Sequence, residues 1–128
     1  MQIDRASGSG PAITGFSPNG FKVEAGDFRG VYRALTIAPE AVAEWDAPAF
    51  ETLSPESLGD LIALDPAPEF LLLGTGATMR RPAPAFVRAL EAKGIGVEAM
   101  DSRAAARAWA VLRGEGRWIA GALYPLEE

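Results

Sequence analysis

The residues best suited to chemistry lie together in the middle of the chain. They are two glycines that flank a threonine, followed by two arginines: Gly74, Thr75, Gly76, Arg80 and Arg81. Glycine lets a backbone approach a ligand closely and expose its amides as hydrogen-bond donors, and arginine forms paired hydrogen bonds with carboxylates and phosphates. The pattern therefore indicates capture of a small anion, or of an acidic patch on a partner protein. The structural alternatives are a tight exit from a strand for the glycines and a solvated loop for the arginines.

This pattern is weaker than a dinucleotide-binding fingerprint. In Gly-x-Gly-x-x-Gly the third glycine would fall where the chain has Met79, and two prolines delay the helix that should open there. Glu98 lies roughly where a ribose-binding acid would stand, but a carboxylate is common at that place by chance. Asp101 and Ser102 could supply a base and a hydroxyl, yet their types and position fit an ordinary helix N-cap better. No complete catalytic motif emerges from these residues.

The composition removes most catalytic chemistries. The chain has no cysteine and no histidine, which excludes disulfides, thiolate nucleophiles, the usual zinc ligand sets and every triad with an imidazole base. Acid–base chemistry would have to use Asp, Glu, Lys or Tyr, and a metal would have to be a hard cation on oxygen ligands. We therefore expect a non-catalytic protein with no catalytic residue, no metal site and no cofactor.

Charge and hydropathy narrow the class of partner and the location. The formal net charge is −5, with 17 acidic and 12 basic residues, so the average field repels nucleic acids and anionic membrane surfaces. The apolar runs are too short to cross a bilayer, and the N-terminal residues lack the apolar stretch of a secretory signal. We expect a soluble cytoplasmic protein with a disordered N-terminal arm over residues 1–12 and a single domain over residues 13–128.

The N-terminal part of the sequence predicts short strands separated by turns. Ser17-Pro18-Asn19-Gly20 is a strong hairpin signal, because Asn and Gly tolerate positive φ. Strands are expected at 13–16, 21–23, 28–37 and 41–45. Neither face of the stretch 28–37 is purely apolar, which indicates a partly covered sheet.

The C-terminal part alternates strands and helices. The apolar run at 69–73 is typical of a strand buried on both faces, and ligands gather beyond the carboxyl ends of such strands. The other elements expected are a helix that Ser54 caps, then a helix, a strand, a helix and a strand at 85–93, 95–100, 101–114 and 118–124. This order predicts a right-handed βαβ core and the class α/β, with the N-terminal β region packed against that core.

The tryptophans divide into one core residue and two interface candidates, since tryptophan is enriched at protein-binding hot spots. Trp109 shares one helix face with Ala105 and Leu112 at i, i+4, i+7 spacing, so we assign it to the core. Trp45 ends the short strand expected at 41–45, within a stretch that has no clean period, and Trp118 lies in the last expected strand. We add Trp118 to residues 74–81 as the predicted partner-binding surface.

Short motifs that recur in order link the chain to a known family. They are the run at 71–76, Gly94-Ile95-Gly96-Val97-Glu98, Met100-Asp101, Glu115-Gly116-Arg117, then Ala120, Ala122, Leu123 and Pro125, with Gly30, Pro39 and Trp45 upstream. Over residues 13–125 the chain resembles the family of the mitochondrial respiratory complex I assembly factor 3 and the adipogenesis-associated domain protein. The resemblance implies a single three-layer α/β domain, in which helices flank a central mixed sheet and the N-terminal part adds a β layer.

The resemblance also implies an accessory role. The mitochondrial relative acts with a partner assembly factor on the hydrophilic arm of the NADH:ubiquinone oxidoreductase and is not known for catalysis. We therefore expect a protein partner, either a respiratory-complex subunit or a second assembly factor, which could hold the protein at the inner face of the respiratory membrane. Self-association through the last strand is compatible with this role.

One departure from the family bears on the choice between functions. Relatives often carry a hydroxyl residue, an aromatic and an asparagine where this chain has Ala108, Trp109 and Ala110. Because the polar pair is absent, a specific polar ligand would lack hydrogen-bonding groups here. This favours a protein-binding role over the alternative, a domain or enzyme that recognises a small anion or nucleotide-like ligand through the Gly-Thr-Gly loop and the adjacent arginines.

Overall fold

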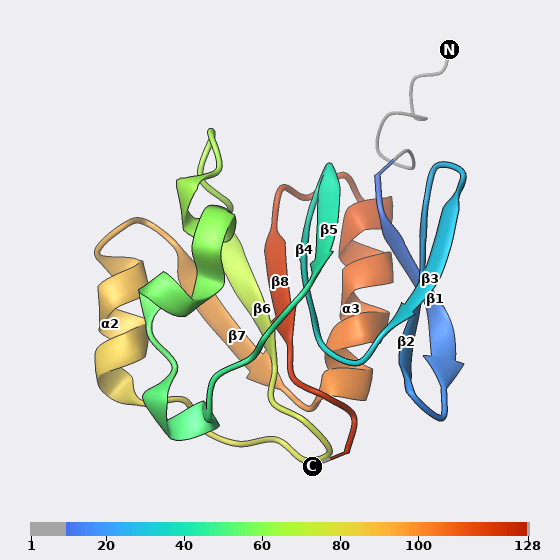
Figure 1. Ribbon diagram of the computed structural model, residues 1–128. Helices are drawn as coiled ribbons and strands as arrows, with labels where there is room; N and C mark the ends of the chain where they lie inside the picture. The colour runs from blue at the N-terminus through green and yellow to red at the C-terminus, as the bar shows by residue number, and fades with distance from the viewer. Residues whose placement is uncertain (1–9, 128) are drawn as a thin grey trace.

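The computed structural model describes residues 10–127 and divides the strands between two sheets (Figure 1). The first sheet is antiparallel and consists of β1 (Ala12–Ser17), β2 (Gly20–Ala25) and β3 (Phe28–Tyr32). Pro18 and Asn19 connect β1 to β2, and the Asn19 amide donates a hydrogen bond to the Ser17 hydroxyl at 3.2 Å. The predicted hairpin is confirmed.

The first strand begins one residue before the expected position. Residues 1–9 of the expected N-terminal arm lie outside the described residues, whereas Pro11 is buried and Ala12 begins β1. The Pro11 carbonyl accepts a hydrogen bond from the indole Nε1–H of Trp109 at 3.2 Å, and Trp109 is 1% exposed. The assignment of Trp109 to the core is therefore confirmed, and ordered structure begins before residue 13.

The stretch 28–37, expected as one strand, is divided between the two sheets. The chain bends at Arg33 after β3, and β4 (Leu35–Ala38) then joins the second sheet. Val31 is 47% exposed, whereas Leu35 and Ile37 are fully buried, although all three would lie on the same face of a regular strand. The bend is needed because a single straight strand would keep these three side chains on one face.

The second sheet lies at the centre of the molecule and has the strand order β5-β4-β8-β6-β7. β6 (Phe70–Gly74) pairs in parallel with β7 (Gly96–Met100) and β8 (Ala120–Leu123). β4 is antiparallel to β8 and to β5 (Ala41–Glu44). The sheet is therefore mixed, and the apolar strand β6 lies inside it, as its lack of polar alternation predicts.

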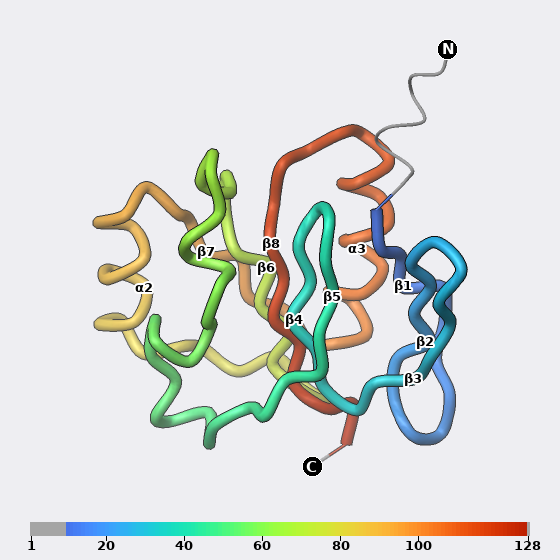
Figure 2. The backbone as a smooth tube through the Cα atoms, turned by 45° about the horizontal axis from the view of Figure 1, so that its top comes forward, coloured from blue at the N-terminus to red at the C-terminus, as the bar shows by residue number. Residues whose placement is uncertain are grey.

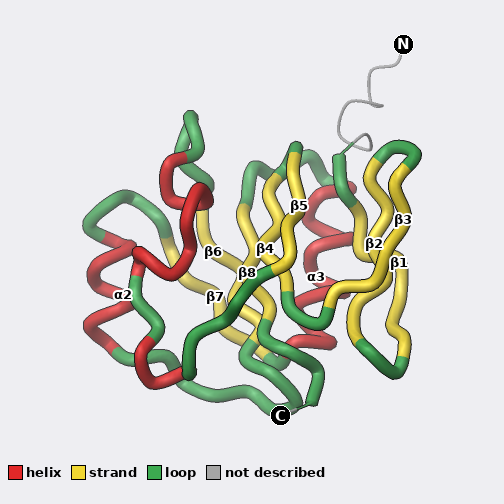
Figure 3. The backbone as a smooth tube through the Cα atoms, viewed as in Figure 1, coloured by secondary structure: helices red, strands yellow, loops and turns green. Residues whose placement is uncertain are grey.

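Helices and the small sheet cover the two faces of the central sheet. The helices are α2 (Pro84–Glu91), α3 (Ser102–Gly114) and the 3-10 helices η1 (Phe50–Thr52) and η2 (Pro55–Ala63). Leu71 and Leu73 pack with α2 and η2, whereas Leu72 packs with α3, β2 and β4. Figure 2 shows α2 and α3 on opposite sides of β6 and β8, and Figure 3 shows β1–β3 as a separate strand layer beside α3. The predicted three-layer α/β domain is confirmed.

The helix predicted to start at Ser54 forms, but as the 3-10 helix η2 and not as an α-helix. The Ser54 amide donates to the Ser57 hydroxyl at 3.2 Å, and Pro55 occupies the first helical position. Inside the helix Gly59 adopts φ 59° and ψ −126°. This conformation interrupts the regular helical hydrogen bonds, so the segment cannot continue as one α-helix.

Candidate functional site

β6 ends in a loop that buried hydrogen bonds join to two other segments. The Ser102 hydroxyl accepts from the Gly76 amide and donates to the Tyr124 carbonyl, both at 2.8 Å. The Ser102 amide donates to the Gly76 carbonyl at 2.8 Å, and the Tyr124 amide donates to the Gly74 carbonyl at 2.9 Å. These bonds join β6, the first turn of α3 and the end of β8. This is the edge of the sheet at which the sequence predicts a site.

The amides of the Gly-Thr-Gly turn are used within the protein. The Thr75 amide donates to the Met100 carbonyl at 2.8 Å, and the Gly76 amide donates to the Ser102 hydroxyl. A Cβ atom on Gly74 would lie 2.8 Å from the Ser102 Oγ, so the absence of a side chain there permits close packing of strand on helix. These two amides therefore do not form the anion-binding nest that the sequence allowed.

Arg80 is held against the protein and is not a solvated loop residue. Its amide donates to the Thr75 hydroxyl and its Nε–H donates to the Thr75 carbonyl, both at 2.9 Å. Its guanidinium carbon lies 4.2 Å from the ring centroid of Phe50 and 5.7 Å from that of Tyr124, within the range of cation–π contacts. Arg80 therefore fixes the loop to aromatic side chains of two neighbouring segments.

Residues 77–81, which we call the arginine loop, direct other side chains outward. Ala77 and Thr78 are exposed, and Met79 is 54% exposed. Arg81 is exposed beside them, whereas Arg80 is half-buried. The two arginines, which the sequence presents as a pair, thus differ: Arg80 anchors the loop and Arg81 faces solvent.

Ser102 is the site residue whose role the sequence analysis missed. Asp101 caps α3, because its Oδ2 accepts from the Ala104 amide at 3.2 Å. Ser102 is fully buried and shares a face of α3 with Ala105 and Trp109. That spacing of i, i+3 and i+7 is visible in the sequence, and a hydroxyl on a buried helix face requires a hydrogen-bond partner.

The structure separates Trp118 from the other predicted site residues. β6 and β8 are parallel, with Gly74 beside Leu123, so Trp118, which precedes β8, lies at the opposite end of the sheet. There its indole Nε1–H donates to the Pro66 carbonyl at 2.7 Å. Residues 74–81 and Trp118 therefore do not form one continuous surface.

An exposed ion pair lies at this opposite end. The Arg117 guanidinium donates twice to the Glu69 Oε1, from Nη2 at 2.7 Å and from Nε at 3.0 Å. The hydrogen bond from Arg117 lowers the pKa of Glu69, and the same bond raises the pKa of Arg117. The pair connects the residue before β6 to the segment before β8.

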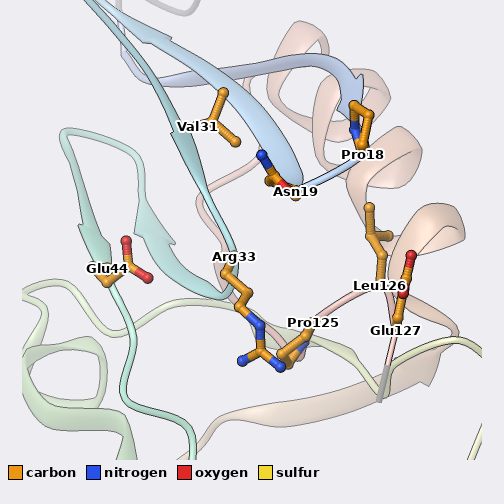
Figure 4. Close-up of a pocket in the computed structure, with 9 residues that line it drawn as sticks. Pro18, Asn19, Val31, Arg33, Glu44, Pro125, Leu126 and Glu127 are labelled. Atoms are coloured by element: carbon orange, nitrogen blue, oxygen red, sulfur yellow. The ribbon is translucent and has the colours of Figure 1, made fainter.

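Two clefts border the carboxyl end of β6. The smaller, which we call the aromatic cleft, has a volume of about 220 Å³ and is lined by residues 45–50, Arg80 and Tyr124, among others. The larger, about 630 Å³, lies between the β1–β2 turn and residues 125–127 (Figure 4). Arg33 lines both clefts, and Figure 4 shows its side chain extending toward Pro125. Within the described part of the chain, no three His, Cys, Asp or Glu side chains group as a metal site requires.

Tyr124 brings a buried polar atom to the aromatic cleft. It is 5% exposed, and its ring makes edge contacts with Trp45 at 4.9 Å and Phe50 at 5.5 Å between centroids. Its hydroxyl exposes less than 1 Å² and has no hydrogen-bond partner among the described residues. Burial raises the pKa of Tyr124 to about 12, although Arg80 acts to lower this pKa and Glu51 acts to raise it. The hydroxyl therefore stays protonated at neutral pH and can donate a hydrogen bond.

Residues 13–124, which include all four helices of the described part and all of its strands except the first residue of β1, match a family described as a protein of unknown function (DUF498/DUF598). The chain belongs to this family. One relative is the NADH dehydrogenase (ubiquinone) 1 alpha subcomplex assembly factor 3 of Danio rerio, 31% identical over 96% of this chain and 69% of the relative. An uncharacterised protein of Rhodobacter capsulatus is 33% identical over 89% of this chain and 84% of its own. The family predicted from the motifs is confirmed.

Solved structures of bacterial proteins share the fold. A crystal structure from Bordetella parapertussis superposes with a TM-score of 0.77 at 36% identity, and covers 91% of this chain and 97% of its own. A solution structure from Bordetella pertussis, described as a Mth938-like domain, has a TM-score of 0.75 at 28% identity and covers 100% and 92% of the two chains. The layered arrangement is therefore shared with these bacterial proteins.

Proposed function

We propose that this protein is a non-catalytic accessory protein that binds other proteins during the assembly of respiratory complex I. The Danio rerio relative is named as an assembly factor for a subcomplex of NADH dehydrogenase, and its similarity extends over 96% of this chain. The chain covers 69% of that relative and 65% of the Bos taurus one. The proposal therefore concerns the part of the assembly factors that this chain shares.

The arginine loop is the proposed partner-binding surface. Hydrogen bonds to Thr75 and Ser102 hold its base, and Arg80 anchors its far end, while Met79 and Arg81 face solvent. Methionine and arginine are both enriched at protein interfaces, and a preorganised loop loses little conformational entropy on binding. In this proposal the Gly-Thr-Gly turn shapes the loop, Arg81 and Met79 contact the partner, and Trp118 belongs to a separate surface.

The anion-binding alternative is less well supported. It requires free backbone donors in the Gly-Thr-Gly turn, whereas the Thr75 and Gly76 amides donate to the Met100 carbonyl and the Ser102 hydroxyl. Rearranging the turn would leave buried groups without partners. Protein binding through exposed side chains requires no such rearrangement.

We infer that the partner is a respiratory-complex subunit or a second assembly factor, and that the protein acts in the cytoplasm at the inner face of the respiratory membrane. The name of the Danio rerio relative supports a partner of this kind. In residues 10–127, none of the helices combines the length and the apolar character needed to cross a membrane.

Affinity purification of the tagged full chain from its native cells tests the role and the surface together. The test variant is Met79→Asp with Arg81→Glu, which leaves the anchor Arg80 intact. Arg88→Glu, which reverses a charge at an exposed position of α2 as Arg81→Glu does in the loop, is the control. Both variants should keep the wild-type melting temperature because their side chains lie at the surface.

We expect complex I subunits or a second assembly factor with the wild type and with Arg88→Glu, and their loss with the double variant. Equal retention by all three proteins would overturn the assignment of the arginine loop. Retention of no respiratory protein by the wild type would overturn the assembly role itself.

A further inference from the structure

The hydroxyl of Tyr124 is a buried polar group without a hydrogen-bond partner among residues 10–127. Tyr124 is 5% exposed, and no described residue forms a hydrogen bond with its Oη atom. Buried polar side chains in proteins are nearly always hydrogen-bonded, because an unpaired one loses its contacts with water and gains nothing in return. Such an atom beside a cleft therefore points to a binding partner that supplies an acceptor.

The aromatic cleft around this hydroxyl favours an acceptor with negative charge. Arg33 and Arg80 line it, against the single carboxylate of Asp46. Glu51, which does not line the cleft, acts to raise the pKa of Tyr124. Arg33 is exposed and forms no ion pair with the residues that the structure describes. The cleft thus combines a buried neutral donor with a cationic side chain at the surface.

The size of the cleft limits the ligand. Its volume of about 220 Å³ corresponds to roughly seven water molecules at ~30 Å³ each. This accommodates one acidic side chain, a chain terminus or a small organic acid, and it is too small for a nucleotide. Trp45 and Phe50 form apolar walls, against which the flat face of a carboxylate can pack.

We propose that the aromatic cleft binds a carboxylate group, which accepts a hydrogen bond from the Tyr124 hydroxyl and pairs with Arg33. Because the hydroxyl exposes less than 1 Å², the surrounding side chains shift slightly when the ligand enters; rotamer changes of this kind are common on binding. The inference does not depend on the proposed function, since the carboxylate belongs either to a free acid or to a partner protein.

The experiment follows the indole resonances of the three tryptophans by NMR while carboxylate probes are added to the full chain. Trp45 lines the cleft, whereas Trp109 lies in the opposite core and Trp118 at the far end of the sheet, so the last two are internal controls. The probes are N-acetylglutamic acid α-amide, N-acetylalanine and succinate. They represent an acidic side chain, a chain terminus and a free dicarboxylate, and each is paired with its neutral amide.

We expect at least one carboxylate probe to shift the Trp45 resonance saturably, while its neutral amide and the two control resonances show no change. The probe with the lowest Kd then identifies the source of the carboxylate. Tyr124→Phe keeps the ring and removes only the hydroxyl, and it should raise that Kd about tenfold, as expected for a hydrogen bond to a charged group. Arg33→Gln should also weaken binding, and Tyr32→Phe, outside the cleft, should not.

Two results would overturn the proposal: no saturable Trp45 shift with any carboxylate probe, or equal affinity of Tyr124→Phe and the wild type. Both are distinguishable from failure of the assembly role, because the probes are small molecules and the variants leave Met79 and Arg81 unchanged. Conversely, loss of partner capture by the loop variant leaves the response to the probes intact.

Discussion

The two ends of the central sheet are closed by different kinds of polar contact. At the carboxyl end of β6, the fully buried Ser102 links the backbones of Gly76 and Tyr124. At the amino end, Arg117 and Glu69 form an ion pair with side chains that are 40% and 47% exposed. Loss of the Ser102 hydrogen bonds leaves buried backbone groups without a partner and out of reach of water. In contrast, water and salt ions readily replace the contacts of the exposed ion pair. The difference indicates that the carboxyl end is the rigid one, and it also carries the arginine loop and the aromatic cleft.

Removing the buried hydroxyl should have the largest effect. Ser102→Ala leaves the Gly76 amide and the Tyr124 carbonyl without their partner, so we expect the free energy of unfolding to fall by about 2–4 kcal/mol. Denaturant unfolding measures this loss. Ser17→Ala is the control, because that hydroxyl accepts a hydrogen bond from the Asn19 amide in an exposed turn and its removal should cost about 0.5 kcal/mol or less. Equal losses in the two variants would refute the contrast between the ends.

The Tyr124 hydroxyl should make the carboxyl end sensitive to alkali. The pKa of Tyr124 is about 12 in the folded protein and 10.0 in its ordinary state, so between these values the folded chain retains a proton that the unfolded chain has lost. The contribution of the protonated Tyr124 to the free energy of unfolding is therefore fully present below pH 10. It falls as the pH rises toward 12, by up to about 2 kcal/mol.

Tyr124→Phe has no such proton, so its stability should decline less over this range. At neutral pH the variant should be at least as stable as the wild type, because the hydroxyl has no partner to lose among the residues that the structure describes. Parallel unfolding curves of both proteins from pH 7 to 11.5 measure the difference. Superimposable pH profiles would contradict the burial of this hydroxyl.

The ion pair at the amino end should show the smallest effect. The pKa of Glu69 is lowered by Arg117, so its contribution is present at neutral pH and is lost as pH falls through the lowered value. Glu69→Gln should therefore change the melting temperature only slightly at pH 7, and added salt should reduce the difference further. A loss as large as that of Ser102→Ala would show that both ends are equally rigid.

The sequence predicted the elements that depend on neighbouring residues. The apolar run before Gly74 forms the inner strand β6, and Pro18 and Asn19 form the hairpin turn. The spacing of Trp109 placed it correctly in the core. Asp101 acts as the N-cap that its type and position indicate. In each case the deciding interactions are local or follow from a regular period along the chain.

Local sequence patterns are less informative where distant segments meet. The stretch 28–37 has a strand pattern throughout, but its two halves belong to different sheets. Arg80 and Arg81 are adjacent and chemically identical, yet only Arg80 reaches the Thr75 carbonyl and the Phe50 ring. The sequence predicts that Trp118 extends the surface at 74–81, but the parallel pairing of β6 and β8 places it at the other end of the sheet.

The sequence by itself determined the class of the fold, the position of β6 and the turn that follows it, because apolar periodicity and turn chemistry act over a few residues. Only the tertiary structure decided which groups at that turn remain available to a ligand or partner. The partners of Ser102 lie 26 and 22 residues away along the chain, and Phe50 meets Tyr124 from the opposite half of the sequence. Such contacts are set by how distant segments pack. In the described part of the chain, they leave the Gly76 amide hydrogen-bonded and the Tyr124 hydroxyl without a partner.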